Sequence, residues 1–461
     1  MDSIPCLNIL EHARISAPSG TIGHRSLSLT FFDITWLLFP PVHHLFFYDF
    51  PHSKSHFMDT IVPRLKQSLS VTLQHFFPFA SNLIVFPNTD GSGFNKKPEI
   101  KHVEGDSVVV TFAECCLDFN NLTGNHPRKC ENFYPLVPSL GNAIKLCDCV
   151  TVPLFSLQVT FFPGSGISLG MTNHHSLGDA STRFNFLKGW TSIIQSGVDR
   201  SFLTKGSPPV FDRLINIPHL DENKLRHTRL ESFYKPSSLV GPTDKVRSTF
   251  VLTRTNINLL KKKVLTQVPN LEYMSSFTVT CGYIWSCIAK SLVKIGERKG
   301  EDELEQFIIT IDCRSRLDPP IPTAYFGNCG APCVPTLKNV VLTSENGYAL
   351  GAKVIGESIC KMIYNKDGIL KDAARWHEPF MIPARKIGVA GTPKLNLYDF
   401  DFGWGKPIKY ETVSIDYNTS ISINASKTSA QDLEIGLSLP SMQMEAFSSI
   451  FDEGLESQVS L

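Results

Sequence analysis

Apolar residues recur along this chain with two periods, which predict a mixture of helices and strands. A four-residue recurrence predicts an amphipathic helix over 56–75. The recurring positions are Phe57, Ile61, Leu65, Leu69 and Leu73. Alternating or continuous apolar runs predict strands over 26–33, 107–113, 154–162 and 166–172. The last two runs are separated by Pro163-Gly164-Ser165-Gly166, which is typical of a turn between adjacent strands.

A second helix is predicted directly after the last of these strands. Residues 180–195 contain no proline, and Phe184, Leu187, Trp190 and Ile194 return at helical spacing. Asp179 stands just before this run, where a carboxylate can accept hydrogen bonds from the free N–H groups of the first turn. We therefore expect a strand to run into a capped helix through residues 173–179.

Residues 205–245 separate two halves of similar character. This segment loses periodicity and gathers five prolines with mixed charge, so we interpret it as a crossover between domains 1–204 and 246–461. In the second half, strands are predicted near 247–253, 306–313, 409–415 and 431–438, with helices from Ser275 or Ser276 to about 293 and over 344–365. The predicted class is α/β, with α+β mixed sheets in two domains.

Composition and charge exclude several classes of protein. The 461 residues carry 44 Lys+Arg and 43 Asp+Glu, and this balance supplies no overall positive field for a nucleic acid. The most apolar stretch, 34–50, is broken by prolines and histidines and falls short of the ~20 residues of a membrane helix. No export signal is visible at the start, and twelve cysteines without a matching ligand pattern fit a reduced, metal-free protein. We expect a cytosolic protein without membrane or nucleic-acid partners.

The connection after the 166–172 strand holds the best candidate for catalysis. His175 and Asp179 form a His-xxx-Asp spacing within Asn173–Asp179. A histidine titrates near neutrality and can take a proton from a hydroxyl group. The spacing by itself is weak, because His102 and Asp106 repeat it in a polar stretch. A pair of interior histidines, His174 and His175, without a chemical role is the alternative.

A competing motif lies just upstream. Gly166-Ile-Ser168-Leu-Gly170 fits the Gly-x-Ser-x-Gly of a serine hydrolase. The nucleophile of such an enzyme sits on a sharp turn into a helix, whereas Leu169 and Met171 continue the strand pattern here. A serine hydrolase that uses Ser168 is therefore the rival from another class.

A third motif, Asp401-Phe-Gly-Trp-Gly405, completes a recognisable set. Two glycines beside a tryptophan and an acid describe a tight aromatic loop. The order and spacing of His175-xxx-Asp179 and Asp401–Gly405 resemble the BAHD family of plant acyl-CoA-dependent acyltransferases over essentially the whole chain. Tyr325-Phe-Gly-Asn-Cys329 further resembles a motif of the family's anthocyanin and flavonoid glycoside branch.

This resemblance implies a two-domain, chloramphenicol-acetyltransferase-like fold with a channel at the domain interface. His175 would stand in the channel as general base in a ternary complex, with no covalent acyl-enzyme. Asp179 and Arg314 would form a structural salt bridge, and Asp401 would support the catalytic loop. Thr392 is a candidate donor to the oxyanion.

The resemblance also assigns the binding residues. Arg183 would bind the free carboxylate of a malonyl group with two parallel hydrogen bonds. Trp36 and His44 would line the acceptor side of the channel. The CoA phosphates would meet a basic run and a helix start, formed by Lys261, Lys262, Lys263, Ser275 and Ser276.

The function implied is transfer of malonyl from malonyl-CoA to the glucose 6″-hydroxyl of an anthocyanin or flavonoid 3-O-glucoside. Malonyl-CoA would be a co-substrate, with no cofactor or metal bound permanently, and the protein would act as a monomer. A hydroxycinnamoyl-CoA-dependent transferase of the same fold is the alternative, because an aromatic acyl group prefers an uncharged, roomy pocket at residue 183.

Overall fold

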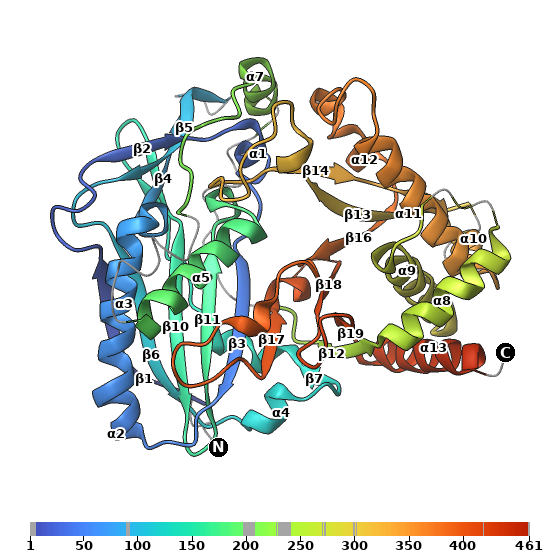
Figure 1. Ribbon diagram of the computed structural model, residues 1–461, viewed down its shortest axis with the longest axis horizontal. Helices are drawn as coiled ribbons and strands as arrows, with labels where there is room; N and C mark the ends of the chain where they lie inside the picture. Colours follow the sequence, from blue (N-terminus) through green and yellow to red (C-terminus); the bar gives the residue numbers. More distant parts are fainter. Residues whose placement is uncertain are drawn as a thin grey trace.

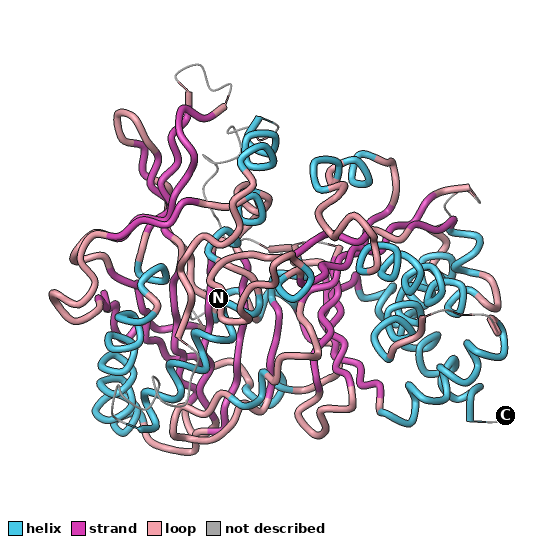
Figure 2. Tube along the Cα trace, turned by 45° about the horizontal axis from the view of Figure 1, so that its top comes forward, coloured by secondary structure: helices cyan, strands magenta, loops and turns pink. Residues whose placement is uncertain are grey.

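Two halves of mixed sheet and helix lie side by side in the computed structural model, with strands through the middle and long helices on both outer sides (Figures 1 and 2). The structure describes residues 6–88, 93–196, 208–226, 228, 241–269, 271, 273–297, 300, 302–417 and 419–459. Parts of the predicted crossover, 205–207, 227 and 229–240, lie outside the described residues, so the domain boundaries stay a prediction.

The first half is built on a mixed sheet in the order β1-β6-β10-β11-β3-β17. Its strands are β1 (Leu7–Ser16), β3 (Val42–Asp49), β6 (Ser107–Cys115), β10 (Phe155–Phe162), β11 (Gly166–Asn173) and β17 (Lys409–Thr412). The predicted hairpin is confirmed, because β10 and β11 pair antiparallel from Phe155–Asn173 to Phe162–Gly166. Every residue of β10 and β11 is buried, so both faces of these strands are covered.

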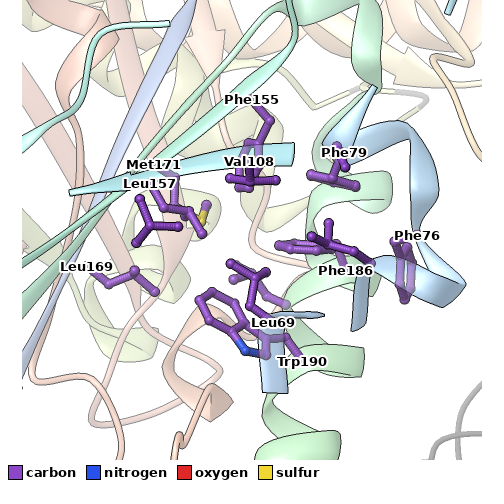
Figure 3. Packing of buried hydrophobic residues seen from close by; sticks show 14 of the residues in the cluster. Leu69, Phe76, Phe79, Val108, Phe155, Leu157, Leu169, Met171, Phe186 and Trp190 are labelled. Carbon is purple, nitrogen blue, oxygen red and sulfur yellow. The ribbon is translucent and has the colours of Figure 1, made fainter. Parts of the chain in front are cut away.

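Two helices cover one face of this sheet (Figure 1). The predicted helix over 56–75 is confirmed as a continuous run of α2 (Lys54–His56), a π-helical turn (Phe57–Ile61) and α3 (Val62–His75). The second is α5 (Ala180–Ser196), also as predicted. Leu69 of α3 packs with Phe186 and Trp190 of α5 against the sheet (Figure 3), and the Trp190 Nε1–H donates to Ser68 Oγ at 2.9 Å.

The strand predicted over 26–33 is correct only in its first part. The chain forms β2 (Arg25–Ser28) and then a short helix, α1 (Phe31–Ile34). The cause is a capping box, in which the Asp33 carboxylate accepts from the backbone N–H and the hydroxyl of Thr30, at 3.0 and 2.9 Å. Burial of Phe31 and Phe32 produced the apolar pattern that looked like a strand.

β2 belongs to a smaller sheet at one end of the first half, in the order β2-β5-β4-β9-β8. Its other strands are β4 (Asn82–Pro87), β5 (Phe94–His102), β8 (Ile144–Lys145) and β9 (Val150–Pro153).

The second half has its own mixed sheet, in the order β14-β13-β16-β18-β19-β12-β7, with β15 paired to β13. Its strands are β7 (Arg128–Lys129), β12 (Lys245–Leu252), β13 (Leu304–Asp312), β14 (Gly330–Cys333), β15 (Thr336–Lys338), β16 (Arg385–Ala390), β18 (Ser420–Ala425) and β19 (Leu433–Pro440). The outer side carries α8 (Arg254–Gln267), α9 (Ser276–Lys294), α11 (Gly347–Ile363) and α13 (Ser441–Val459). The predicted helices near 275–293 and 344–365 are confirmed, as are the strands near 247–253, 306–313 and 431–438.

Each half of the chain contributes one strand to the sheet of the other half. β17 pairs with β3 in the first sheet, and β7 pairs with β12 in the second. The strand predicted over 409–415 is shorter than expected, because the chain turns into a 3₁₀ helix at Val413–Asp416.

The described helices include none that is long and apolar enough to cross a bilayer.

Buried ion pairs connect β17 with β7 and β12. The Glu411 carboxylate of β17 meets Arg128 Nη1 of β7 at 2.7 Å and Arg247 Nε of β12 at 3.3 Å. Arg247 also pairs with Asp416 at 3.3 Å. All four side chains are at most 4% exposed. The two halves are thus joined by ion pairs that water does not screen.

Candidate active site

His175 lies on the predicted strand-to-helix connection. β11 ends at Asn173, and residues His175–Leu177 form one 3₁₀ turn before α5. The His174 ring caps this turn, since its Nδ1 accepts from the Ser176 backbone N–H at 3.2 Å. Asp179 caps α5 by accepting from the Thr182 N–H at 3.1 Å, as predicted.

The His175 ring is held between aromatic side chains. The Trp36 ring stacks on it with centroids 3.9 Å apart and an angle of 11°, and the Phe39 ring meets it edge-on at 5.5 Å. Nδ1 of His175 is buried, which leaves Nε2 as the nitrogen that can meet a substrate. Burial and the positive charge of Arg183 lower the pKa of His175 from 6.5 to about 3. The imidazole is therefore neutral near pH 7 and can accept a proton.

The Asp179 carboxylate points to Arg314 rather than to the His175 ring. Arg314 Nη1 and Nη2 donate to its two oxygens at 2.8 and 3.1 Å. The same guanidinium donates to the carbonyl oxygens of Tyr325 and Gly327, at 3.3 and 3.0 Å. Burial alone would raise the pKa of Asp179, but the charge and hydrogen bonds of Arg314 outweigh it and hold that pKa below its usual value. This ion pair ties the start of α5 to residues 325–329.

Asn328 and Asp33 hold the catalytic turn, and sequence reasoning missed this role of both. Asn328 Nδ2 donates to the His175 carbonyl oxygen at 3.0 Å and to Asp33 Oδ1 at 3.1 Å. The Asn328 backbone N–H donates to the same Asp33 oxygen at 2.8 Å, and Ser176 Oγ donates to the Asp33 carbonyl at 3.2 Å. In the sequence, the motif at 325–329 was interpreted only as a feature of the glycoside branch of the family. The polar Asn328 within this mostly apolar motif was the feature that could have indicated its structural role.

A cavity lies between α5, the first sheet and the loop after β16. It measures about 430 Å³, with open solvent at its mouth included. Among its lining residues are three predicted site residues, Arg183, His44 and Thr392, together with Tyr410 and Asn424. The structure therefore brings the expected malonyl, acceptor and oxyanion residues to one place.

Arg183 supplies a positive charge to this cavity, and Asp179 is a carboxylate whose charge acts on it without forming an ion pair. Its Nη1 donates to the Gly178 carbonyl oxygen at 3.2 Å, and it forms no ion pair with any carboxylate in the described part of the chain. Burial lowers the pKa of Arg183, yet a guanidinium stays charged at any physiological pH. A partly buried, unpaired guanidinium is a site for an anion.

The residues expected to bind CoA lie elsewhere. Lys261, Lys262 and Lys263 lie on α8, on the outer side of the second half and away from α5 (Figure 1). Lys262 is exposed, and burial lowers the pKa of Lys261. Ser275 Oγ accepts from the Thr278 N–H at 3.1 Å, so this hydroxyl caps α9, whose first residue is Ser276. The structure does not place these residues beside the cavity.

Asp401 organises its own loop. Its Oδ1 accepts from the backbone N–H groups of Gly403 and Gly405, at 2.7 and 3.0 Å. Its carbonyl oxygen accepts from Gln195 Nε2 at 2.7 Å, near the C-terminal end of α5. Because a helix rises 1.5 Å per residue, that contact lies roughly 24 Å along α5 from Asp179. The loop thus anchors the far end of the helix whose start carries His175.

Ser168 has none of the geometry of a hydrolase nucleophile. It lies in the middle of β11, paired with Thr160 of β10 and Phe47 of β3, and it is 0% exposed. No turn follows it, and substrate cannot reach its hydroxyl. The structure gives the hydrolase interpretation no support. Within the described residues, His, Cys, Asp and Glu also form no group of three that could hold a metal ion.

Comparison with known proteins agrees with this geometry. Residues 7–453 match the transferase family. The chain is 67% identical over 460 residues to malonyl-coenzyme A:anthocyanin 3-O-glucoside-6''-O-malonyltransferase of Dahlia pinnata, with 100% of both chains covered. The chain belongs to the BAHD acyltransferase family.

Other family members show how widely the likeness extends. The chain is 36% identical to coumaroyl-CoA:anthocyanidin 3-O-glucoside-6''-O-coumaroyltransferase 2 of Arabidopsis thaliana, with 97% of both chains covered. The crystal structure of vinorine synthase superposes with a TM-score of 0.68 at 18% identity, covering 95% of this chain and 96% of that one. The predicted two-domain BAHD fold is thereby confirmed.

Proposed function

We propose that this protein transfers malonyl from malonyl-CoA to the glucose 6″-hydroxyl of anthocyanin, or flavonoid, 3-O-glucosides. The observation that carries the proposal is the Arg183 guanidinium, which lines the cavity without an ion-pair partner among the described residues and whose charge acts on His175. Malonyl-CoA differs from most acyl-CoA donors by a free carboxylate, which a guanidinium binds with two hydrogen bonds. The Dahlia relative, identical at 67% of positions, carries this activity in its name. We further propose a cytosolic monomer with no resident cofactor.

His175 acts as the general base in a ternary complex. Neutral Nε2 takes the proton of the glucose hydroxyl while the hydroxyl oxygen attacks the thioester carbonyl. The tetrahedral intermediate then collapses, the C–S bond breaks, and the CoA thiolate takes the proton back from the imidazolium. A thiolate is a good leaving group, so no covalent acyl-enzyme is needed.

Three further roles complete the proposal. Thr392, which lines the cavity, is the candidate donor to the oxyanion. Trp36, which stacks on His175, is the candidate for contact with the flavonoid ring. For the CoA phosphates, the candidates stay those expected from sequence, on α8 and at the start of α9 outside the cavity: Lys261, Lys262, Lys263, Ser275 and Ser276.

Replacing Arg183 by methionine should lower kcat/KM for malonyl-CoA by about 10–100-fold, because a charge-assisted pair of hydrogen bonds is lost. The kcat/KM for acetyl-CoA should change little, because acetyl has no carboxylate. The measurement is a competition assay with an anthocyanidin 3-O-glucoside and equimolar malonyl-, acetyl- and coumaroyl-CoA, with products identified by mass.

The wild-type protein should form the malonyl ester almost alone in this assay. A coumaroyl ester as main product would favour the hydroxycinnamoyl alternative, for which the Arabidopsis relative is a precedent at 36% identity. Equal losses for malonyl- and acetyl-CoA in the Arg183 variant would show that Arg183 acts on the fold rather than on the donor.

On the acid side, kcat/KM should begin to fall only at a pH well below the ordinary pKa of histidine. Only neutral His175 is a base, and its pKa of about 3 keeps it neutral throughout pH 5–8. Removing the positive charge of Arg183 should raise that pKa, so the acid limb of the Arg183→Met variant should move to higher pH. Acetyl-CoA is the donor for this pH series of kcat/KM, because its binding does not need Arg183. Identical limbs in both proteins would contradict the proposed coupling.

A further inference from the structure

A second polar group faces the cavity beside Arg183. His44 lies on β3, is 6% exposed and lines the cavity together with Arg183 and Tyr410. Its Nε2 is buried and has no hydrogen-bond partner among the described residues. Buried polar atoms in native proteins are almost always bonded, so an exception on a residue that lines a cavity points to an absent ligand atom.

A chain of hydrogen bonds decides which nitrogen of His44 carries the proton. Thr412 Oγ donates to the Tyr410 hydroxyl oxygen at 3.3 Å, and that hydroxyl lies 2.7 Å from His44 Nδ1. Because Thr412 donates, the hydrogen of the Tyr410 hydroxyl has Nδ1 as its acceptor, which leaves the hydrogen of the neutral ring on Nε2. Burial and the charge of Arg183 hold the pKa of His44 well below its usual value, so the ring stays neutral. His44 therefore presents a neutral N–H donor without an acceptor.

The occupant of this position has to accept hydrogen bonds from two donors of different charge. The Arg183 guanidinium is complemented by an anion, and His44 Nε2–H is complemented by an acceptor oxygen. Arg183 and His44 both line this cavity, and His175 is not among its lining residues, so His44 belongs to the anion-binding end rather than to the reacting carbonyl. The phosphates of CoA lie at the other end of the pantetheine arm from the thioester, so the anion that can meet both donors beside the reacting group is the terminal carboxylate of malonyl.

We propose that His44 is a specificity-determining residue, which binds the terminal malonyl carboxylate through Nε2–H alongside Arg183, with Tyr410 holding its tautomer. This role rests on the proposed malonyl donor. It places His44 on the donor side, in contrast to the acceptor side expected from sequence. Acetyl-CoA leaves both donors unpaired, and a site built to bond a polar group rejects the analogue that lacks it.

The test measures kcat/KM of the full-length protein for malonyl-CoA and acetyl-CoA with one anthocyanidin 3-O-glucoside. His44→Leu should lower the malonyl-to-acetyl ratio about 10-fold or more, and His44→Gln, which keeps an N–H donor, should restore part of it. Tyr410→Phe should lower the ratio less, because the ring remains but its tautomer is free. The matched control is His43→Leu. His43 lies next in the strand, faces the opposite side and bonds Thr172 Oγ at 2.8 Å, so its ratio should equal that of the wild type.

The ratio is independent of the fraction of protein that folds, so a destabilised variant still gives a result. An unchanged ratio in both His44 variants, or a rise only in KM for the glucoside, would overturn the donor role and restore the acceptor role. A wild-type protein that does not prefer malonyl-CoA would instead refute the proposed function, and the role of His44 with it. The wild-type ratio and the variant ratios thus separate the two failures.

Discussion

Replacing His175 by alanine should lower kcat by about 10²–10⁴-fold, the usual contribution of a general base. The KM for malonyl-CoA should change little, because the carboxylate is bound by other residues. The physical reason is that the neutral His175 imidazole is the proposed acceptor of the hydroxyl proton, whereas the His174 imidazole at the same turn already accepts from the Ser176 N–H. The loss is measured as release of free CoA together with the mass of the glucoside ester.

His102 offers a matched control for this variant. It is the histidine of the second His-xxx-Asp spacing, but it lies on β5, in the small sheet at the far end of the first half (Figure 1). His102→Ala should keep its kcat per folded molecule. A His175→Ala protein that retains more than a tenth of the wild-type kcat would mean that a different group removes the proton.

Replacing Glu411 by glutamine should lower the free energy of unfolding by about 3–5 kcal/mol, because it leaves the buried Arg128 without its counter-charge and Arg247 with Asp416 alone. Arg128 and Arg247 are 0% and 1% exposed and both depend on this carboxylate. Glu411 is also the neighbour of Tyr410 on β17, so unpairing this strand would open the cavity. Urea unfolding of the two proteins measures the difference.

The same group makes the fold sensitive to acid. Burial alone would raise the pKa of Glu411, but the charges of Arg128, Arg247 and Lys409 outweigh it and lower that pKa to about 2. A lowered pKa contributes stability that is complete above pH 4.5 and is lost as the pH falls toward 2. The Glu411→Gln protein should lack this part of the acid dependence.

Glu378 is the control for the glutamate change. It accepts two hydrogen bonds from Arg375, at 2.8 and 2.9 Å, but both side chains are exposed. Glu378→Gln should leave the unfolding curve nearly unchanged, because exposed ion pairs contribute little. Equal effects at Glu378 and Glu411 would contradict the argument from burial.

Local pattern was enough to predict the elements that carry His175. The hydrophobic period of 56–75, the turn between two apolar runs and the cap at Asp179 each involve residues close in sequence. The exception shows the limit: Phe31 and Phe32 looked like the end of a strand, and a capping box between Thr30 and Asp33 made a helix instead. An apolar run reports burial, and it does not by itself distinguish a short helix from a strand.

The chain's own sequence therefore determined most of the elements, the position of the proposed base and, by resemblance, the family. Only the tertiary structure decided which residues form hydrogen bonds and ion pairs with one another. Asn328 reaches Asp33 across 295 residues, Arg128 reaches Glu411 across 283, and His44 reaches Tyr410 across 366. Sequence periodicity shows which side chains are buried, but a hydrogen bond or ion pair depends on distance in space. That distance is set when β17 joins the first sheet and brings Tyr410 and Glu411 with it.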